Sequence, residues 1–284
     1  MAGFDWYQAT IPAPVDDVLE GCLHLGGQVG FRHAKGMHGY ATSTVLSDAQ
    51  GDLGRILHGG SHSRPHVIFT SDAAQAGAEL IRARFPEHLV TRVDAREDFG
   101  GDGVFDQTLP SLLAAAESHR VRVDTRGDHL LRHEARTVYL GAPSSAVRFR
   151  MYDKAAELRA KFAADPVRLA EVPPSLTRLE AQVRPQTALA RKAFASIEPM
   201  AVMGCSAWLR DIWEQVAGLK LEPVQVGKPW RQADDDRAYA YLLAQYGGLL
   251  ERLKADLGSW ACVGEQLGHD LSERRAVARR GKPG

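Results

Sequence analysis

The stretch 147–154 constrains this chain most, because its residues alternate between apolar and polar at the two-residue period of a β-strand. One side carries only apolar side chains. The other side carries a tyrosine and three cations, namely Arg148, Arg150, Tyr152 and Lys154. A phenol among cations can attack a phosphodiester, since its oxygen is a nucleophile and the cations stabilise the charge that develops on phosphorus. The same alternation is also typical of an ordinary strand with one solvated face.

Two further predicted strands have a charged side. One contains Arg92 and Asp94, and the other contains Arg178 and Glu180. If the three strands are neighbours in one sheet, their charged groups share a surface and helices cover the opposite, apolar surface. The two carboxylates could then hold a divalent cation such as Mg²⁺ or Mn²⁺, or each could form an ion pair with an arginine.

The pattern along the chain predicts an α+β fold. Strands are expected at 4–11, 39–46, 51–57, 66–70, 88–99, 121–125, 136–141, 147–154 and 176–185. Helices are expected at 15–25, 71–85, 104–118, 155–164, 188–195, 207–219 and 238–257. This order favours a mixed, largely antiparallel sheet with helices packed on one face and a polar face, which would carry the active site, on the other.

The strand pattern ends near residue 187. We therefore expect an α+β domain at 1–187 and a helical C-terminal extension at 188–284. The extension ends in a basic stretch, 272–282, which is either a solvated, frayed tail or a contact to the DNA backbone.

Composition limits the function classes. Lys+Arg 35 against Asp+Glu 35 leaves no net charge, so a nucleic-acid site has to be a local concentration of cations. Three cysteines, Cys22, Cys205 and Cys262, lie far apart, which suggests neither a disulfide framework nor a zinc site. No apolar run approaches the roughly 20 residues that span a bilayer. We expect a cytoplasmic protein without a membrane partner.

Five short motifs occur in the order found in the replication initiation factors of rolling-circle plasmids and filamentous phages. The motifs are Phe4-Asp5-Trp6-Tyr7, Thr91-Arg92-Val93-Asp94, Thr137-Val138-Tyr139-Leu140-Gly141, Arg150-Met151-Tyr152-Asp153-Lys154 and Thr177-Arg178-Leu179-Glu180. The chain resembles this family over about 4–195. The resemblance implies a sequence-specific endonuclease that nicks the double-strand origin of a phage or plasmid, stays joined to the 5′-phosphate through a tyrosine, and later rejoins the strand.

The resemblance and the charge pattern together predict residue roles. Tyr152 matches the family's nucleophile, and Arg150 and Lys154 are expected to stabilise charge. The metal ligands are expected to be Asp94 and Glu180, with Asp5 as a third acidic position that the resemblance adds. The arginines expected to contact DNA are Arg92, Arg148, Arg178 and Arg184. The expected partners are origin DNA, as duplex, hairpin or single strand, a host helicase and a second copy of the chain.

Several alternatives stay open. The chain could be a non-catalytic DNA-binding initiator or regulator of the same fold. A tyrosine recombinase, suggested by His133 and Arg136 upstream of Tyr152, would place its tyrosine on a helix and need no metal. Tyr139 is a rival nucleophile or a packing residue. Three histidines spaced by four are a second potential metal site, namely His58, His62 and His66. The glycine motifs of nucleotide-binding and serine-hydrolase enzymes do not occur.

Overall fold

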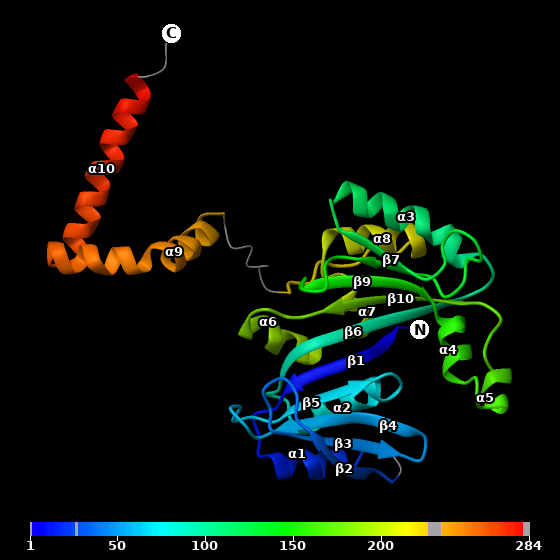
Figure 1. The fold of residues 1–284 in the computed structure, drawn as a ribbon. Coiled ribbons are helices and arrows are strands. Elements are labelled where there is room, and N and C mark those ends of the chain that lie inside the picture. The colour runs from blue at the N-terminus through cyan, green and yellow to red at the C-terminus, as the bar shows by residue number, and fades with distance from the viewer. Residues whose placement is uncertain (1, 26–27, 227–233, 281–284) are drawn as a thin grey trace. The chain divides into compact units, whose positions relative to one another are not determined.

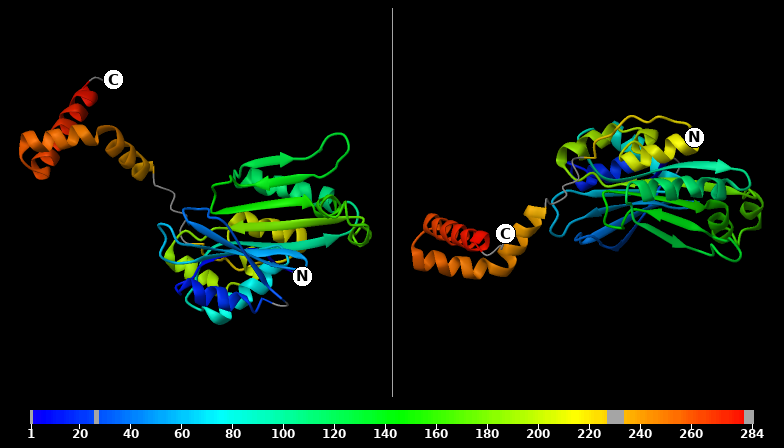
Figure 2. Two further views of the ribbon diagram at one scale, coloured as in Figure 1. Left: turned by 60° about the horizontal axis from the view of Figure 1, so that its bottom comes forward. Right: turned by 90° about the horizontal axis from the view of Figure 1, so that it is seen from above.

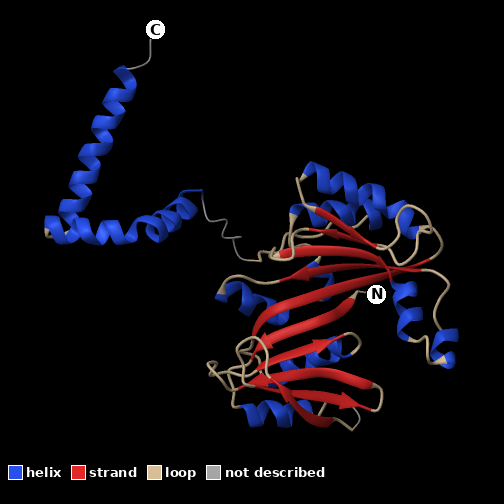
Figure 3. Ribbon diagram, in the orientation of Figure 1, coloured by secondary structure: helices blue, strands red, loops and turns tan. Residues whose placement is uncertain are grey.

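The structure is a computed structural model that describes residues 2–25, 28–226 and 234–280. The chain divides into two compact units, Met1–Pro229 and Trp230–Gly284. The first unit contains a β-sheet and its covering helices, and the second contains two long helices (Figures 1 and 3).

Within the described residues, the first unit contains a ten-stranded sheet in the order β2-β3-β4-β5-β1-β6-β10-β9-β8-β7. All neighbouring strands are antiparallel. The strands are β1 (Gly3–Thr10), β2 (Gly30–Lys35), β3 (Thr42–Asp48), β4 (Gly51–His58), β5 (His66–Thr70), β6 (Leu89–Gly100), β7 (Val123–Arg126), β8 (Thr137–Leu140), β9 (Val147–Asp153) and β10 (Leu176–Val183). The predicted α+β class with a largely antiparallel sheet is confirmed.

Helices cover the apolar face of this sheet, and the view from above in Figure 2 shows most of them on one side. The helices of the first unit are α1 (Val15–Cys22), α2 (Ala73–Arg84), α3 (Val104–Ser118), α4 (Lys154–Lys161), α5 (Pro166–Ala170), α6 (Ala188–Ala193), the 3₁₀ turn η1 (Phe194–Ser196), α7 (Pro199–Val202) and α8 (Ala207–Ala217). Phe149 and Leu179 of the sheet belong to one buried cluster with Phe105 of α3 and Trp213 of α8. This cluster leaves the opposite side chains of the central strands free to build a polar face.

Local sequence explains where two of these helices form. In α2, Ala74, Ala78 and Ile81 recur at helical spacing and are all buried, so one stripe of the helix faces the sheet. In α8, the Ser206 side chain accepts a hydrogen bond from the backbone N–H of Leu209 and caps the first turn. Gly218 ends α8 at φ 65°, a left-handed conformation that glycine adopts without steric cost.

The predicted boundary at residues 187 and 188 lies inside the first unit. Phe194 and Trp213 are fully buried in the core of the sheet domain, and α6 and α7 contact β6. The helical segment therefore serves two purposes. Its first part completes the core of the sheet domain, because the apolar faces of β6 and β10 need a cover. Its last part forms the second unit.

The second unit contains α9 (Asp234–Leu257) and α10 (Trp260–Arg280). Large apolar side chains are exposed along both helices, among them Leu242, Tyr246, Leu249, Trp260 and Leu267. The basic stretch at 272–282 is helical as far as Arg280, and residues beyond it lie outside the described part of the chain. None of the described helices combines the length and the low polarity that a membrane-crossing segment requires.

Four elements have no counterpart among the ranges expected from the sequence, namely β2, α5, α7 and α10. The residues of β2 are mostly exposed, and the strand lies at the edge of the sheet, paired with β3. Its sequence has no buried side to reveal a period, so only the pairing defines it as a strand. The short α5 is capped by Asp165, whose side chain accepts a hydrogen bond from the Arg168 backbone N–H.

Candidate active site

The three charged strands are consecutive neighbours in the sheet, in the order β6, β10, β9. In this register, Arg178 lies between Asp98 of β6 and Tyr152 of β9. Two residues further, Glu180 lies between Arg96 and Arg150. The charged sides predicted for these strands therefore form one continuous surface, which we call the polar face.

A β-bulge in β1 brings Asp5 to the polar face. The pairing of β1 with β6 shifts by one residue between Phe4 and Trp6, so that Asp5 has no directly opposite partner on β6. Phe4 and Tyr7 are buried in the core, whereas Asp5 contacts arginines of the polar face. Asp5, which only the family resemblance suggested as a metal ligand, therefore lies on the same face as Asp94 and Glu180 because of the bulge in β1.

Arg178 is the centre of an ion-pair cluster near Tyr152. Its side chain is 7% exposed, and its Nη1 lies 2.7 Å from the Asp5 Oδ1. Its Nε and Nη2 donate to the two oxygens of Asp98 at 2.6 and 2.7 Å, a bidentate geometry. Burial alone would raise the pKa of Asp98, but the bonds and charge of Arg178 hold it below its usual range. Arg178 is therefore bound within the protein.

Asp94 and Glu180 are the most buried carboxylates of the polar face, at 1% and 2% exposure. Arg92 binds both oxygens of Asp94, at 2.8 and 2.5 Å. The Oε2 of Glu180 accepts a hydrogen bond from Arg150 Nη2 at 2.6 Å. Burial raises the pKa of Glu180, and the charges of Asp94 and Asp5 add to this rise against the opposing effect of Arg150. Three carboxylates thus crowd one buried region.

The donor set agrees with the type of ligand that Mg²⁺ and Mn²⁺ prefer, since Asp5, Asp94 and Glu180 provide only carboxylate oxygens. In the described residues, no group of three or more His, Cys, Asp or Glu side chains is arranged around a common point to hold a metal ion. The carboxylates instead bind arginines. A divalent cation would therefore have to replace guanidinium groups as their partner, and it would relieve the crowding that raises the pKa of Glu180.

Tyr152 lies on β9 with 5% of its surface exposed. The Arg150 guanidinium carbon lies 4.7 Å from the centre of its ring, and Lys154 Nζ lies 5.8 Å from it. Burial raises the pKa of Tyr152, and the charge of Glu180 raises it further. The phenol is therefore neutral at physiological pH and becomes a strong nucleophile only when a base takes its proton.

Glu157, in the first turn of α4, is a candidate for this base because its carboxylate interacts with the Tyr152 side chain. Its Oε1 accepts a hydrogen bond from Lys154 Nζ at 2.7 Å. Burial tends to raise the pKa of Glu157, but hydrogen bonds from Lys154 and from Tyr152 lower it below its usual range. Lys154 is the first residue of α4, not the last of β9, so it reaches Glu157 three residues later on the same helix face.

At the other end of the polar face, a cavity of about 280 Å³ contains most of the arginines predicted to contact DNA. Its lining includes Arg92, Arg148, Arg150, Arg184 and Tyr139, and we call it the arginine pocket. The predicted DNA-contacting residues therefore separate into two places, because Arg178 lies in the ion-pair cluster and the other three line the pocket.

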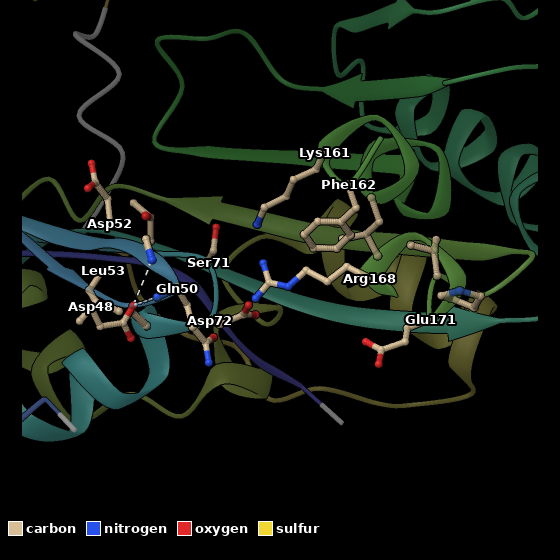
Figure 4. Close-up of a pocket in the computed structure, with 16 residues that line it drawn as sticks. Asp48, Gln50, Asp52, Leu53, Ser71, Asp72, Lys161, Phe162, Arg168 and Glu171 are labelled. Atoms are coloured by element: carbon tan, nitrogen blue, oxygen red, sulfur yellow. Dashed lines mark hydrogen bonds between the residues drawn. The ribbon is translucent and has the colours of Figure 1, made fainter. Parts of the chain in front are cut away.

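A larger cavity, of about 380 Å³, lies between the β3–β4 turn, the start of α2 and the segment α4–α5. Figure 4 shows Lys161 and Arg168 extending toward Ser71 and Asp72. Its acidic lining residues outnumber these two cations and are Asp48, Asp52, Asp72 and Glu171. None of the residues predicted for catalysis lines it, and its mixed charge is less suited to a phosphate than that of the arginine pocket.

The alternative sites have ordinary structural partners. His66 Nδ1 lies 3.1 Å from the Thr10 hydroxyl, His58 Nε2 lies 3.2 Å from the Thr44 hydroxyl, and the His62 ring stacks on Tyr40. Arg136, part of the recombinase-like stretch, forms an ion pair with Asp106. Tyr152 lies on a strand, whereas the recombinase alternative requires a helix.

Sequence reasoning assigned no role to three residues that complete the polar face. Asp98 lies four residues after Asp94 on β6, so the two-residue period of a strand places both side chains on the same side, as the sequence already indicated. Glu157 follows Lys154 by three residues, a spacing that predicts an ion pair once the helix is assigned. Trp6 lies under the Arg92 guanidinium, whose central carbon is 4.2 Å from the ring centre. That contact depends on the β1–β6 pairing, which no local pattern reveals.

Comparison with known proteins identifies a solved structure with a similar fold. No protein-family model and no curated protein matches the sequence. Among solved structures, the chain is similar to a rolling circle replication initiator protein from Geobacillus stearothermophilus, with a TM-score of 0.51 and 17% sequence identity. The alignment covers 80% of this chain and 98% of that one. At this identity the likeness shows a shared fold.

Proposed function

We propose that this chain is a rolling-circle replication initiator that nicks and rejoins one DNA strand at a phage or plasmid origin through a 5′-phosphotyrosine. The observation that carries the proposal is the position of Tyr152 beside Arg150 and Arg178, on a polar face that also holds the carboxylates Asp94 and Glu180. The shared fold with an initiator of this kind supports it.

Residues of this chain can carry out each step of the proposed strand transfer. The Tyr152 oxygen forms a bond to the scissile phosphorus while the bond from phosphorus to the 3′-oxygen breaks, and the departing 3′-oxygen takes a proton from water to become a 3′-hydroxyl. The phenol proton passes to Glu157, which is half-exposed and can release it to water. Arg150 and Lys154 stabilise the negative charge on the phosphoryl oxygens. For rejoining, the 3′-hydroxyl attacks the phosphorus of the phosphotyrosine and loses its proton to water, while the bond from phosphorus to the Tyr152 oxygen breaks and the departing phenolate recovers a proton from water.

We assign Asp94, Glu180 and Asp5 as the residues that would hold Mg²⁺ or Mn²⁺. When bound, such an ion polarises the scissile phosphate as a Lewis acid. Binding can be measured without activity, by the paramagnetic signal of Mn²⁺ titrated with protein. We expect Asp94→Asn to weaken Mn²⁺ binding and Asp52→Asn, a carboxylate on an exposed ion pair, to leave it unchanged. Equal binding by the two variants would remove these carboxylates from the metal proposal.

Partners follow from the same assignment. Arg92, Arg148 and Arg184 are the proposed DNA-contacting residues, and origin DNA is the proposed substrate. Arg178, which the sequence also suggested as a DNA contact, is buried and bound to Asp5 and Asp98, so we do not assign it this role. We assign the exposed apolar side chains of α9 and α10 to protein partners, either a host helicase or a second copy of this chain.

The decisive experiment is a nicking assay on a supercoiled plasmid that carries the DNA flanking this chain's gene, with Mg²⁺ or Mn²⁺. We expect relaxed circles and a covalent protein–DNA adduct from the wild type and from Tyr139→Phe, and neither product from Tyr152→Phe. Nicking that persists in Tyr152→Phe would overturn the nucleophile. Specific binding of the flanking DNA without nicking would instead support the non-catalytic initiator.

A further inference from the structure

We propose that the arginine pocket binds a phosphate of the attacked DNA strand other than the one that Tyr152 attacks. This inference rests on the proposed function for the identity of its ligand. The pocket lies on the polar face, and its lining contains four arginines against one carboxylate, Glu180, which already binds Arg150. A backbone phosphate is the anion that a DNA-binding surface offers to such a pocket.

Two of the pocket arginines have no carboxylate partner in the described part of the chain. Arg148 packs on the Tyr139 ring, 4.2 Å from its centre, and its Nε is buried without a hydrogen-bond partner among the described residues. Arg184 donates to the backbone carbonyls of Pro143 and Ser145 at 3.0 and 3.3 Å. A buried N–H without a partner is costly, so the contacts within the described residues leave the Arg148 guanidinium incompletely hydrogen-bonded.

Both side chains are held in place before any ligand arrives. The two carbonyls fix one end of the Arg184 guanidinium, and the aromatic ring supports the plane of Arg148. Such preorganisation lowers the entropic cost of binding, because fewer rotamers are lost when the ligand enters. The pocket therefore has the properties of a prepared anion site, not of a solvated strand face.

The pocket concentrates positive charge at a cost to the folded protein. Partial burial and then the charges of Arg92 and Arg148 lower the pKa of Arg184, while Asp94 acts in the opposite direction. Like charges held together in a concave, partly buried region create a positive potential that attracts anions. A phosphate placed between Arg148 and Arg184 would offset their repulsion.

The end of the pocket that contains Arg148 is too far from Tyr152 for one phosphate to contact both residues. Arg148 precedes Tyr152 by four residues on β9, which corresponds to roughly 13 Å along a strand. Arg150 lies between them, lining the pocket and contacting the Tyr152 ring. The DNA strand is thus held at two points along β9, and the pocket sets which phosphate lies at the tyrosine.

The test measures binding in the absence of divalent metal, with an oligonucleotide chosen for its affinity and not for its cleavage. A series of single-stranded oligonucleotides carries one uncharged methylphosphonate each, moved along the backbone. We expect one position, distinct from the cleaved phosphate, at which the wild type loses about tenfold in affinity. The Arg184→Gln variant should bind the unmodified oligonucleotide about tenfold more weakly than the wild type does. A methylphosphonate at that position should weaken its binding little further.

Controls separate this result from a general loss of charge or of folding. Arg32→Gln removes an arginine of the edge strand β2, which pairs with Asp52 at 2.8 Å, and should not change the methylphosphonate profile. Arg184→Lys keeps the charge and should recover part of the affinity, with unchanged circular dichroism. If the Arg184→Gln substitution weakens binding by the same factor wherever the methylphosphonate is placed, the pocket does not bind a defined phosphate. If the wild type shows the expected methylphosphonate profile but does not nick DNA, the proposed function is refuted, whereas the phosphate site in the arginine pocket is supported.

Discussion

The two ends of the polar face use arginine in opposite ways. Beside Tyr152, Arg178 and Arg150 are bound to Asp5, Asp98 and Glu180. In the arginine pocket, by contrast, Arg148 and Arg184 contact an aromatic ring and backbone carbonyls, neither of which carries a full negative charge. The charges at the tyrosine end largely cancel and fix geometry. Those at the pocket end are available to a ligand.

This difference has an energetic basis. Buried ion pairs seldom add net stability, because desolvation offsets much of their attraction, but losing one partner leaves a buried charge that is expensive. The tyrosine end is therefore sensitive to single substitutions through folding. The pocket end should tolerate the loss of an arginine in the free protein and reveal it on binding DNA.

The largest expected effect concerns the base that completes the tyrosine end. Glu157→Gln removes the proposed acceptor of the Tyr152 proton, so we expect the nicking rate to fall about a hundredfold or more, with unchanged DNA affinity. Glu87→Gln is the matched control, since Glu87 also pairs with a lysine, Lys192, at 2.9 Å. A Glu157→Gln variant that nicks at the wild-type rate would make Glu157 a residue that only positions Lys154.

The next effect is on stability. Arg178→Gln leaves Asp5 and Asp98 without their main partner, and we expect it to lower the free energy of unfolding by about 3 kcal/mol, as for other broken buried pairs. Arg148→Gln breaks no such pair and should cost less than about 1 kcal/mol. Urea unfolding followed by circular dichroism measures both. Equal losses for the two variants would erase the distinction between the two ends.

The same contrast explains what the sequence could predict. The alternation in β9, β6 and β10 identified the charged sides and the residues on them, because a two-residue period depends only on local sequence. The adjacency of the strands, the β1 bulge that brings in Asp5, and the contact of Trp6 with Arg92 depend on pairing between distant segments. No local pattern specifies which strands pair.

The sequence left metal binding and ion pairing open as alternatives for the two carboxylates. The parity of Asp94 and Glu180 was compatible both with a metal site and with ion pairs, and only the register places Arg150 opposite Glu180. The sequence pattern did not indicate the boundary between the two units, at Pro229 and Trp230, for a related reason. Residues of α6 to α8 have a helical period whether they pack on the sheet or stand apart, so the sequence did not show that Trp213 is a core residue.

Ionisation of Tyr152 offers a third test of the tyrosine end. Burial and Glu180 raise its pKa above the ordinary value of about 10, so the difference in tyrosinate absorbance between wild type and Tyr152→Phe should begin only above that pH. The pKa of Tyr152 is higher in the folded protein than in the unfolded chain. Neutral Tyr152 therefore contributes fully to the stability of the fold below about pH 10, and this contribution is lost as the pH rises further. Glu180→Gln should lower the onset, and an onset near that of a free phenol would show an unburied ring.

Salt dependence gives a smaller but direct measure of the pocket end. Arg184 has no carboxylate partner among the described residues, so Arg184→Gln should reduce the slope of log affinity against log salt by about 0.7, the value for one lost contact to a single strand. Arg96→Gln, which removes an arginine that already pairs with Asp98 at 3.0 Å, should change the slope less. Identical slopes for the two variants would mean that paired and unpaired arginines contact DNA equally.

The smallest effect distinguishes the two tyrosines. Tyr139 supports the Arg148 guanidinium through its ring, and that contact is worth about 0.5–1 kcal/mol at a partly exposed position. Tyr139→Phe keeps the ring and should preserve both nicking and affinity. Tyr139→Leu removes the ring and should weaken DNA binding by about threefold, as measured by fluorescence anisotropy. If Tyr139→Phe abolished the covalent adduct while Tyr152→Phe retained it, the nucleophile would lie in the arginine pocket, and the two ends of the polar face would exchange their roles.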